Sequence, residues 1–210
     1  MLCAALYLFA IGELILLRWI EPPTTMVQVQ RRVEAFVRRQ PYHKRYEFVS
    51  LEDISANLHH AVVAAEDDRF YEHHGIDWKA VQQILDQDFE QGRLGRGGST
   101  ITQQLVKNLF FTTSRNILRK AVEFTLAPVA ELLLSKQRIL ELYLNVVEWG
   151  PGVYGAEAAS ETWYGVSARR LNRDQAARLA ALLPAPRRRR PQRMDAYSRA
   201  ILRRMTQHGW

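Results

Sequence analysis

The sequence has one cysteine and no long run of alternating polar and apolar residues. With only Cys3 present, the 210-residue chain excludes a disulfide framework and a cysteine-rich zinc site. The lack of alternation argues against an extended sheet. Helical apolar spacing recurs instead, so we expect a mainly α-helical domain with one hydrophobic core. The helical stretches lie near 55–66, 77–91, 100–111, 116–134, 136–147, 152–164 and 172–183.

Acidic residues are absent from residue 91 to residue 122, although this stretch carries six cations. Residues 169–210 hold 12 arginines and two aspartates, a net charge of +10, so a chain total of +7 leaves −3 for residues 1–168. Local positive charge in a mildly acidic body indicates an anionic ligand. The six cations are Arg93, Arg96, Lys107, Arg115, Arg119 and Lys120.

The basic excess is concentrated at the C-terminus, around 187–193. A nucleic-acid-binding domain would favour a basic surface over its whole face, so we expect no nucleic acid partner. An anionic membrane surface and a solvated tail both fit this tract.

Residues 1–20 are apolar except for Gly12, Glu13 and Arg18, and a helix of that length spans about 30 Å. We expect a retained transmembrane anchor, with a buried N-terminal helix as the alternative. No basic leader or small-residue cleavage site indicates a removed signal peptide. The predicted organisation is a transmembrane anchor (1–20), a juxtamembrane linker with a short amphipathic helix (21–44), the main domain (45–185) and a basic C-terminal segment (186–210).

The first chemical cluster begins where an apolar helix ends in acids at Glu66 and Asp67. A half-buried carboxylate has a raised pKa, as a general base requires, so Glu66 is the candidate base. The alternative is a helix end with exposed acids. His73 is expected to orient a neighbour through a hydrogen bond rather than to bind metal with His74.

The second cluster follows two glycines. Thr100 and Gln103 have the spacing of a capping box, and a helix N-terminus favours a phosphate group. We expect Ser99, Gln103 and Lys107, spaced by four, to line one polar helix face. The alternative is an ordinary capped helix with a polar surface.

The third cluster repeats charge every four residues at Arg115, Arg119 and Glu123, beside Lys120. Arg119 and Glu123 alone could be a surface ion pair. Two later segments are interpreted as structural: 136–145 has core spacing, and 148–159 has a glycine-rich turn before Glu157.

Together these segments resemble the peptidoglycan glycosyltransferases of glycosyltransferase family 51. The match covers roughly 45–185, and the order of its blocks is specific to that family. The segment at 148–152 and the chain length resemble those of the monofunctional biosynthetic branch of the family. Two positions depart from the family pattern, Val122 and the pair Trp163-Tyr164. The blocks are Glu66-Asp67-x-x-Phe70-x-x-His73-x-Gly75, Gly98-Ser99-Thr100-Ile101-x-Gln103-Gln104-x-x-Lys107-Asn108, Arg119-Lys120-x-x-Glu123, Lys136-x-x-Ile139-Leu140-Glu141-x-Tyr143-Leu144-Asn145 and the run 150–165.

The resemblance implies a lysozyme-like helical fold and polymerisation of lipid II into β-1,4-linked strands, with inversion and release of undecaprenyl diphosphate. It implies Glu66 and Glu123 as the functional carboxylates. It also implies a bacterial inner-membrane enzyme with a periplasmic domain, which overrides the charge rule, because basic residues follow the apolar stretch. No cofactor is obligatory, although Mg²⁺ or Mn²⁺ could sit on the diphosphate. Proteins of the cell-wall synthesis or division machinery are further candidate partners. The expected substrate-binding residues are Asp67, Ser99, Gln103, Lys107, Arg115, Arg119 and Lys120.

Two other functions are weighed against this one. A lysozyme-type glycosidase would need a protonated acid at the leaving oxygen and no cationic window. A non-enzymatic membrane protein would act through the basic tract at 187–193.

Overall fold

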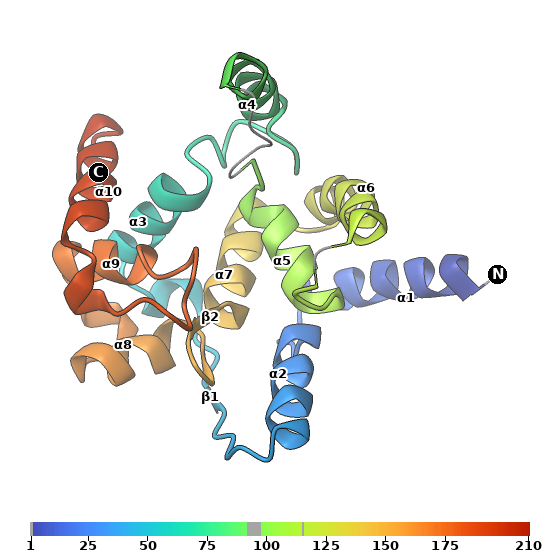
Figure 1. Ribbon diagram of the computed structural model, residues 1–210, viewed down its shortest axis with the longest axis horizontal. Helices are drawn as coiled ribbons and strands as arrows, with labels where there is room; N and C mark the ends of the chain where they lie inside the picture. Colours follow the sequence, from blue (N-terminus) through green and yellow to red (C-terminus); the bar gives the residue numbers. More distant parts are fainter. Residues whose placement is uncertain (1, 92–97, 115) are drawn as a thin grey trace.

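The structure is a computed structural model that describes residues 2–91, 98–114 and 116–210 (Figure 1). It confirms the expected mainly α-helical architecture. The helices are α1 (Leu2–Leu16), α2 (Met26–Val37), α3 (Ala56–Glu66), α4 (Trp78–Gln91), α5 (Ile101–Phe110), α6 (Ile117–Leu133), α7 (Lys136–Val146), α8 (Ala156–Tyr164), α9 (Arg173–Ala180) and α10 (Asp195–Gln207). Short 3₁₀ helices lie at Leu51–Asp53, Ala168–Arg170 and Pro191–Arg193.

A small sheet accompanies the helices, in the order β1 (Arg45–Tyr46), β3 (Val153–Tyr154), β2 (Glu148–Gly150). The β1–β3 pair is parallel and the β2–β3 pair is antiparallel. Strands of two or three residues are too short to show an alternating pattern, so the sequence could not reveal them. Gly152 turns the β2–β3 hairpin at φ +75°, where a Cβ would lie 2.6 Å from the carbonyl oxygen of His43.

Helix α7 forms the centre of the core, as its apolar spacing predicted. Ile139, Leu142 and Leu144 are fully buried, and α7 packs against α5 (Figure 1). Each such side chain contributes about 1.5–3 kcal/mol through removal of apolar surface from water. This packing holds α5, whose first turn enters the functional site.

The apolar face of α2 points outward. Val33, Phe36 and Val37 are exposed, whereas Gln28 is buried and Arg31 pairs with Glu148 at 3.1 Å. The predicted amphipathic helix is therefore present, and its polar side packs on the domain.

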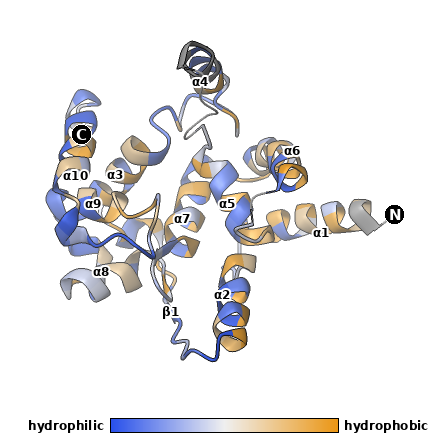
Figure 2. Ribbon diagram, viewed as in Figure 1, coloured by the Kyte–Doolittle hydropathy of each residue, from blue (hydrophilic) through white to orange (hydrophobic). Residues whose placement is uncertain are grey.

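Helix α1 is apolar along its length and extends away from the other helices (Figures 1 and 2). Its buried residues Ala10 and Leu14 belong to the core, and it packs against α6. Within the described ranges, no helix combines the length and the apolar character that a membrane crossing requires. The predicted transmembrane helix at 1–20 is therefore not confirmed.

The basic C-terminal segment lies against the domain. Helix α10 packs on α3 and α9 (Figure 1). Arg187 lies 3.4 Å from Glu34, Arg189 donates to the carbonyl oxygen of Ala181 at 2.7 Å, and the guanidinium of Arg190 lies over the Trp163 ring. Much of the arginine tract is thus engaged within the protein.

Candidate active site

Glu66 is the last residue of α3, where a buried run of Ala61 to Ala64 ends at a polar cleft. Its Oε2 accepts a hydrogen bond of 2.8 Å from Gln104 Nε2. Burial raises the pKa of Glu66, while the Gln104 bond and the positive charges of Lys107 and Arg189 oppose the rise. A carboxylate in this environment can accept a proton nearer to neutral pH than an exposed one.

Asp67 follows Glu66 and is buried. Its carboxylate accepts hydrogen bonds from His73 Nε2 at 2.9 Å and from the backbone N–H of Ile101 at 2.9 Å. The expected orienting role of His73 is confirmed, and the residue that it orients is Asp67. Because these bonds engage both Asp67 oxygens, Asp67 links the end of α3 to the start of α5.

The start of α5 carries the predicted capping box. Thr100 Oγ1 accepts from the Gln103 N–H at 3.1 Å, and Gln103 Oε1 accepts from the Thr100 N–H at 3.2 Å. The Thr100 hydroxyl also donates to the carbonyl oxygen of Gly75 at 2.7 Å. Gly75 has φ +89°, and a Cβ there would lie 2.7 Å from the carbonyl carbon of Ala127, so only glycine fits this approach to α6.

The predicted polar face through Ser99, Gln103 and Lys107 does not form. Ser99 precedes the helix, and Gln103 is buried, with its oxygen engaged in the capping box. Lys107 is mostly buried, and this burial lowers its pKa, with Glu123 and Glu66 opposing the shift. Lys107 therefore lies within the electrostatic field of both Glu66 and Glu123.

The cations of α6 converge on Glu123 and Ser99. Lys120 Nζ donates to Ser99 Oγ at 2.8 Å and lies 3.5 Å from Glu123 Oε2. Arg119 Nη1 lies 3.2 Å from Glu123 Oε1 and donates to the carbonyl oxygen of Thr112 at 3.0 Å.

Glu123 is only 2% exposed, so the interpretation of Arg119 and Glu123 as a surface ion pair is wrong. A buried carboxylate between two cations fixes their positions, and Lys120 in turn contacts Ser99. Arg115, Arg93 and Arg96 lie outside the described residues.

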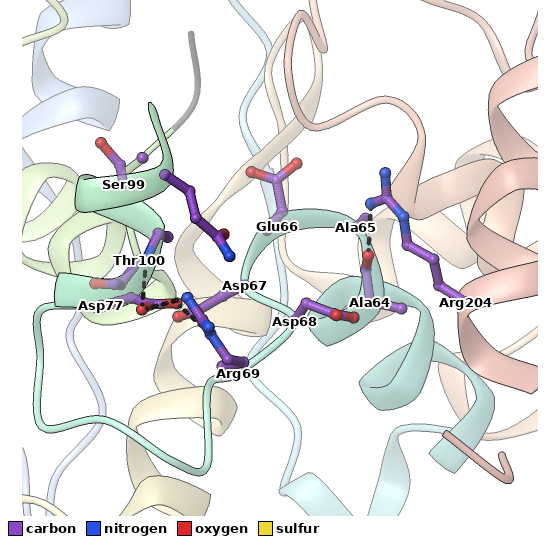
Figure 3. A pocket seen from close by; sticks show the side chains of 13 residues that line it. Ala64, Ala65, Glu66, Asp67, Asp68, Arg69, Asp77, Ser99, Thr100 and Arg204 are labelled. Carbon is purple, nitrogen blue, oxygen red and sulfur yellow. Dashed lines mark hydrogen bonds and ion pairs between the residues drawn. The ribbon is translucent and has the colours of Figure 1, made fainter. Parts of the chain in front are cut away.

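A cleft of about 420 Å³ lies between the end of α3 and the segment that enters α5, and Glu66 and Ser99 both line it (Figure 3). Glu66 projects into it between Ser99 on one side and Arg204 on the other. The candidate base and the hydroxyl bound by Lys120 therefore share one cavity. Its remaining lining includes Asp67, Asp68, Arg69, Asp77, Gly98 and Thr100.

Helix α10 and the residues after it brace α3 at three positions. Trp210 stacks on His60 with ring centroids 4.6 Å apart, Arg204 Nη1 donates to the carbonyl oxygen of Ala64 at 2.9 Å, and His208 Nε2 lies 2.8 Å from Asp68 Oδ1. The three contacted positions are spaced by four along α3 and on to the residues that follow Glu66. No pattern in the sequence predicts this brace, because an arginine-rich end is equally typical of a solvated basic tail.

Gln104 and Tyr143 are two further residues that sequence reasoning missed. Gln104 follows Gln103 in the α5 motif, and the capping-box spacing draws attention to Gln103 alone. Tyr143 has core spacing on α7, yet its hydroxyl donates to Gln104 Oε1 at 3.0 Å. Periodicity identifies its buried ring but cannot show what its hydroxyl contacts.

Glu123 is the carboxylate at which a divalent cation was expected as one alternative. In the part of the chain that the structure describes, no three His, Cys, Asp or Glu residues gather to hold a metal ion. The Glu123 oxygens face Arg119 and Lys120, so this carboxylate pairs with two cations of the protein itself.

Comparison with known proteins finds matches along nearly the whole chain to the family that its sequence motifs resemble. The transglycosylase family model matches residues 32–207. A biosynthetic peptidoglycan transglycosylase of Pseudomonas entomophila (strain L48) is 45% identical over 215 residues, which cover 99% of this chain and 91% of the relative. The protein of the same name from Pseudomonas aeruginosa PAO1 is 48% identical over 170 residues, covering 81% of this chain and 73% of the relative. That of Azoarcus sp. (strain BH72) is 49% identical, covering 79% and 72%.

Proposed function

Because the chain belongs to the transglycosylase family and is a peptidoglycan glycosyltransferase of cell-wall synthesis, we propose that it polymerises lipid II into β-1,4-linked glycan strands, with inversion and release of undecaprenyl diphosphate. The observation that carries this proposal is the shared cleft of Glu66 and the Lys120-bound Ser99. A base and a hydroxyl backed by a lysine, both lining one cleft, suit a single displacement.

Glu66 is the proposed general base. The 4-hydroxyl of the acceptor sugar attacks the anomeric carbon of the donor, and its proton passes to the Glu66 carboxylate. One direct displacement converts the α-linked donor into a β-linked product. The raised pKa of Glu66 suits this step, because it makes the carboxylate a stronger base.

The leaving group is a lipid diphosphate, which needs positive charge rather than a proton donor. Lys107, Arg119 and Lys120 supply that charge in the proposed reaction, with Ser99 as a hydroxyl ligand and Arg115 as a further expected cation. Glu123 holds Arg119 and Lys120 in place from the buried side. Asp67 and Gln103 support the site through the hydrogen bonds that fix the α5 start.

An apolar groove supports a lipid-linked substrate. It has a volume of about 840 Å³ and lies between α1, α2, the end of α5 and α6. Val122, the neighbour of Glu123, lines this groove, so α6 bears the cations on one side and an apolar wall on another. A polyprenyl chain could therefore continue into the groove from a diphosphate held at Lys120.

We further propose that the enzyme works at the bacterial inner membrane, anchored by a single pass at 1–20, with its catalytic domain on the periplasmic side. The exposed apolar side chains of α1 and of α2, such as Phe9 and Phe36, support membrane contact. Proteins of cell-wall synthesis or division are the proposed partners there.

The protein side chains are proposed to neutralise the diphosphate without an obligatory cofactor. A polymerisation assay on lipid II with and without a chelator tests this point. Equal rates are expected, and a rate that falls with chelator and recovers with Mg²⁺ or Mn²⁺ would assign that role to a cation.

The base assignment is tested by Glu66→Gln in the same assay. General base catalysis is worth about 10²–10⁴-fold, so we expect loss of synthesis by that factor with an unchanged fold by circular dichroism. Full polymerisation by the variant would reject Glu66 as the base. Incubation with finished glycan is the second arm, because cleavage of polymer with lipid II untouched would identify a glycosidase.

A further inference from the structure

A hydrogen-bonded chain of three side chains leads from the core to Glu66. Tyr143 Oη donates to Gln104 Oε1 at 3.0 Å, and Gln104 Nε2 donates to Glu66 Oε2 at 2.8 Å. The three residues come from α7, α5 and the end of α3. Tyr143 is fully buried and Gln104 is partly buried, so this chain crosses the core to the cleft.

The direction of this chain is set at its buried end. Burial raises the pKa of Tyr143 well above its ordinary value, so the hydroxyl keeps its proton at every working pH. Among the described residues, Gln104 Oε1 is the acceptor found for that proton. Rotating the Gln104 amide by half a turn would leave the buried hydroxyl without an acceptor, which costs free energy. The amide therefore presents its NH₂ group to Glu66.

We propose that Tyr143 is a positioning residue for the catalytic base, acting through the Gln104 amide, which it holds with its NH₂ group toward the Glu66 carboxylate. The proposal rests on Glu66 being the base, as argued above. A donor on Oε2 fixes the rotation of the carboxylate and favours its ionised form, so the base is aligned and ready when the acceptor hydroxyl arrives.

Other charged groups around Glu66 act in parallel. Lys107 on α5 and Arg189 on the segment before α10 favour the charged form, and the adjacent Asp67 disfavours it. Tyr197 on α10 lies close enough to feel the charge of Glu66. These groups remain in place when Tyr143 or Gln104 is changed, so a change in the pH profile reports on the chain itself.

The test is the pH dependence of kcat for Tyr143→Phe, which keeps the buried ring and removes only the hydroxyl. The acid limb of the profile reports the ionisation of the base in the substrate complex. Without the Tyr143 hydroxyl the Gln104 amide is no longer held, and the resulting weakening of its hydrogen bond to Glu66 is expected to move this limb upward by about one pH unit. The kcat at neutral pH should fall several-fold, with KM unchanged.

The matched control is Tyr154→Phe. Tyr154 is also fully buried, and its hydroxyl lies 3.2 Å from that of Tyr42 in the region of the small sheet. Both variants lose one buried tyrosine hydroxyl and a similar amount of stability. Only Tyr143→Phe should shift the acid limb.

Gln104→Met gives an independent measurement at a position that is less buried than Tyr143 and removes the donor to Glu66 directly. It should shift the acid limb in the same direction, and the double variant with Tyr143→Phe should shift it no further. An unshifted limb in either single variant, or equal shifts for Tyr143→Phe and Tyr154→Phe, would overturn the proposal. Glu66→Gln separates the two hypotheses: inactivity there combined with an unshifted Tyr143→Phe limb rejects only the positioning role.

Discussion

Lys120 Nζ lies 2.8 Å from Ser99 Oγ and 3.5 Å from Glu123 Oε2, so one ammonium group connects the cleft surface to a buried carboxylate. The contact joins α6 to the segment that enters α5. It fixes the Lys120 ammonium group behind Ser99, whose hydroxyl lines the same cleft as Glu66.

The first prediction concerns this ammonium group. Lys120→Ala should weaken the binding of a phosphoglycolipid inhibitor of the family by roughly 10–150-fold, because a hydrogen bond to a charged group contributes about 1.5–3 kcal/mol. Ser99→Ala should cause a smaller loss. Lys44→Ala is the control, since Lys44 packs on the Tyr46 ring near the small sheet. Unchanged inhibitor affinity in Lys120→Ala would locate the diphosphate elsewhere.

Lys107 carries the second prediction. Its ammonium group is largely desolvated between the charges of Glu66 and Glu123, and burial lowers its pKa. Lys107→Ala should reduce inhibitor affinity, and most of the loss should persist at higher salt, because a desolvated charge is screened little by added ions. Titration by fluorescence at two salt concentrations measures both effects. Equal affinity for both proteins at low salt would contradict this assignment.

The third prediction concerns the stability of Glu66→Gln. The folded-state pKa of Glu66 lies above that of an unfolded glutamate, so the folded protein binds more protons between the two values. The contribution of Glu66 to stability is therefore lost as pH rises through this window. Glu66→Gln should be more stable than the parent at pH 7.5, and the difference should diminish toward pH 4. Urea unfolding at both values measures it, and a variant less stable at pH 7.5 would contradict the pKa direction.

His59 provides the opposite pH dependence. Burial, with a smaller effect from His60, lowers the pKa of His59 to about 4. The unfolded chain binds a proton near the ordinary histidine pKa of about 6.5, so stability falls as pH decreases from about 6.5 toward 4.

His59→Gln should flatten the pH dependence of the unfolding free energy in that range. The control is His74→Gln at an exposed histidine, which should leave the slope unchanged. Parallel curves for His59→Gln and the parent would contradict the lowered pKa of His59.

The α10 brace gives a further prediction. Arg204→Met removes the bond to the Ala64 carbonyl and should cost about 1–2 kcal/mol of stability, with a lower kcat because α3 carries Glu66. Arg204→Lys should restore part of both. The neighbouring Arg203→Met is the control, since the Arg203 side chain is exposed and makes no hydrogen bond to the described residues. Equal losses of stability and kcat in Arg203→Met and Arg204→Met would show that only the positive charge of α10 matters, and not the bond to Ala64.

Local signals in the sequence predicted part of this site well. The capping box at Thr100 and the hydrogen bond of His73 depend on near neighbours in the chain, and both are present. Helical spacing identified α7 as core. Such features follow from local chemistry, so one sequence suffices to find them.

The remaining features depend on contacts between distant segments. The predicted Ser99 face failed because the helix begins at Ile101, after Ser99. Arg204 reaches Ala64 across 140 residues, and the Tyr143 hydroxyl reaches Gln104 across 39. Sequence periodicity does not indicate which distant residue the end of such a side chain contacts. These contacts are set by tertiary packing.

Asp67 binds the first backbone N–H of α5 at 2.9 Å, and Thr100 binds Gly75 at 2.7 Å. These two internal bonds fasten the end of α3, which bears the proposed proton acceptor Glu66, to the start of α5, beside the proposed anion ligand Ser99. The separation between the two halves of the reaction centre is thus built in before any sugar arrives. In the proposed reaction, a glycan strand that moves forward by one unit after each turnover would meet the same arrangement of side chains every time. The protein would not need to rearrange between turnovers.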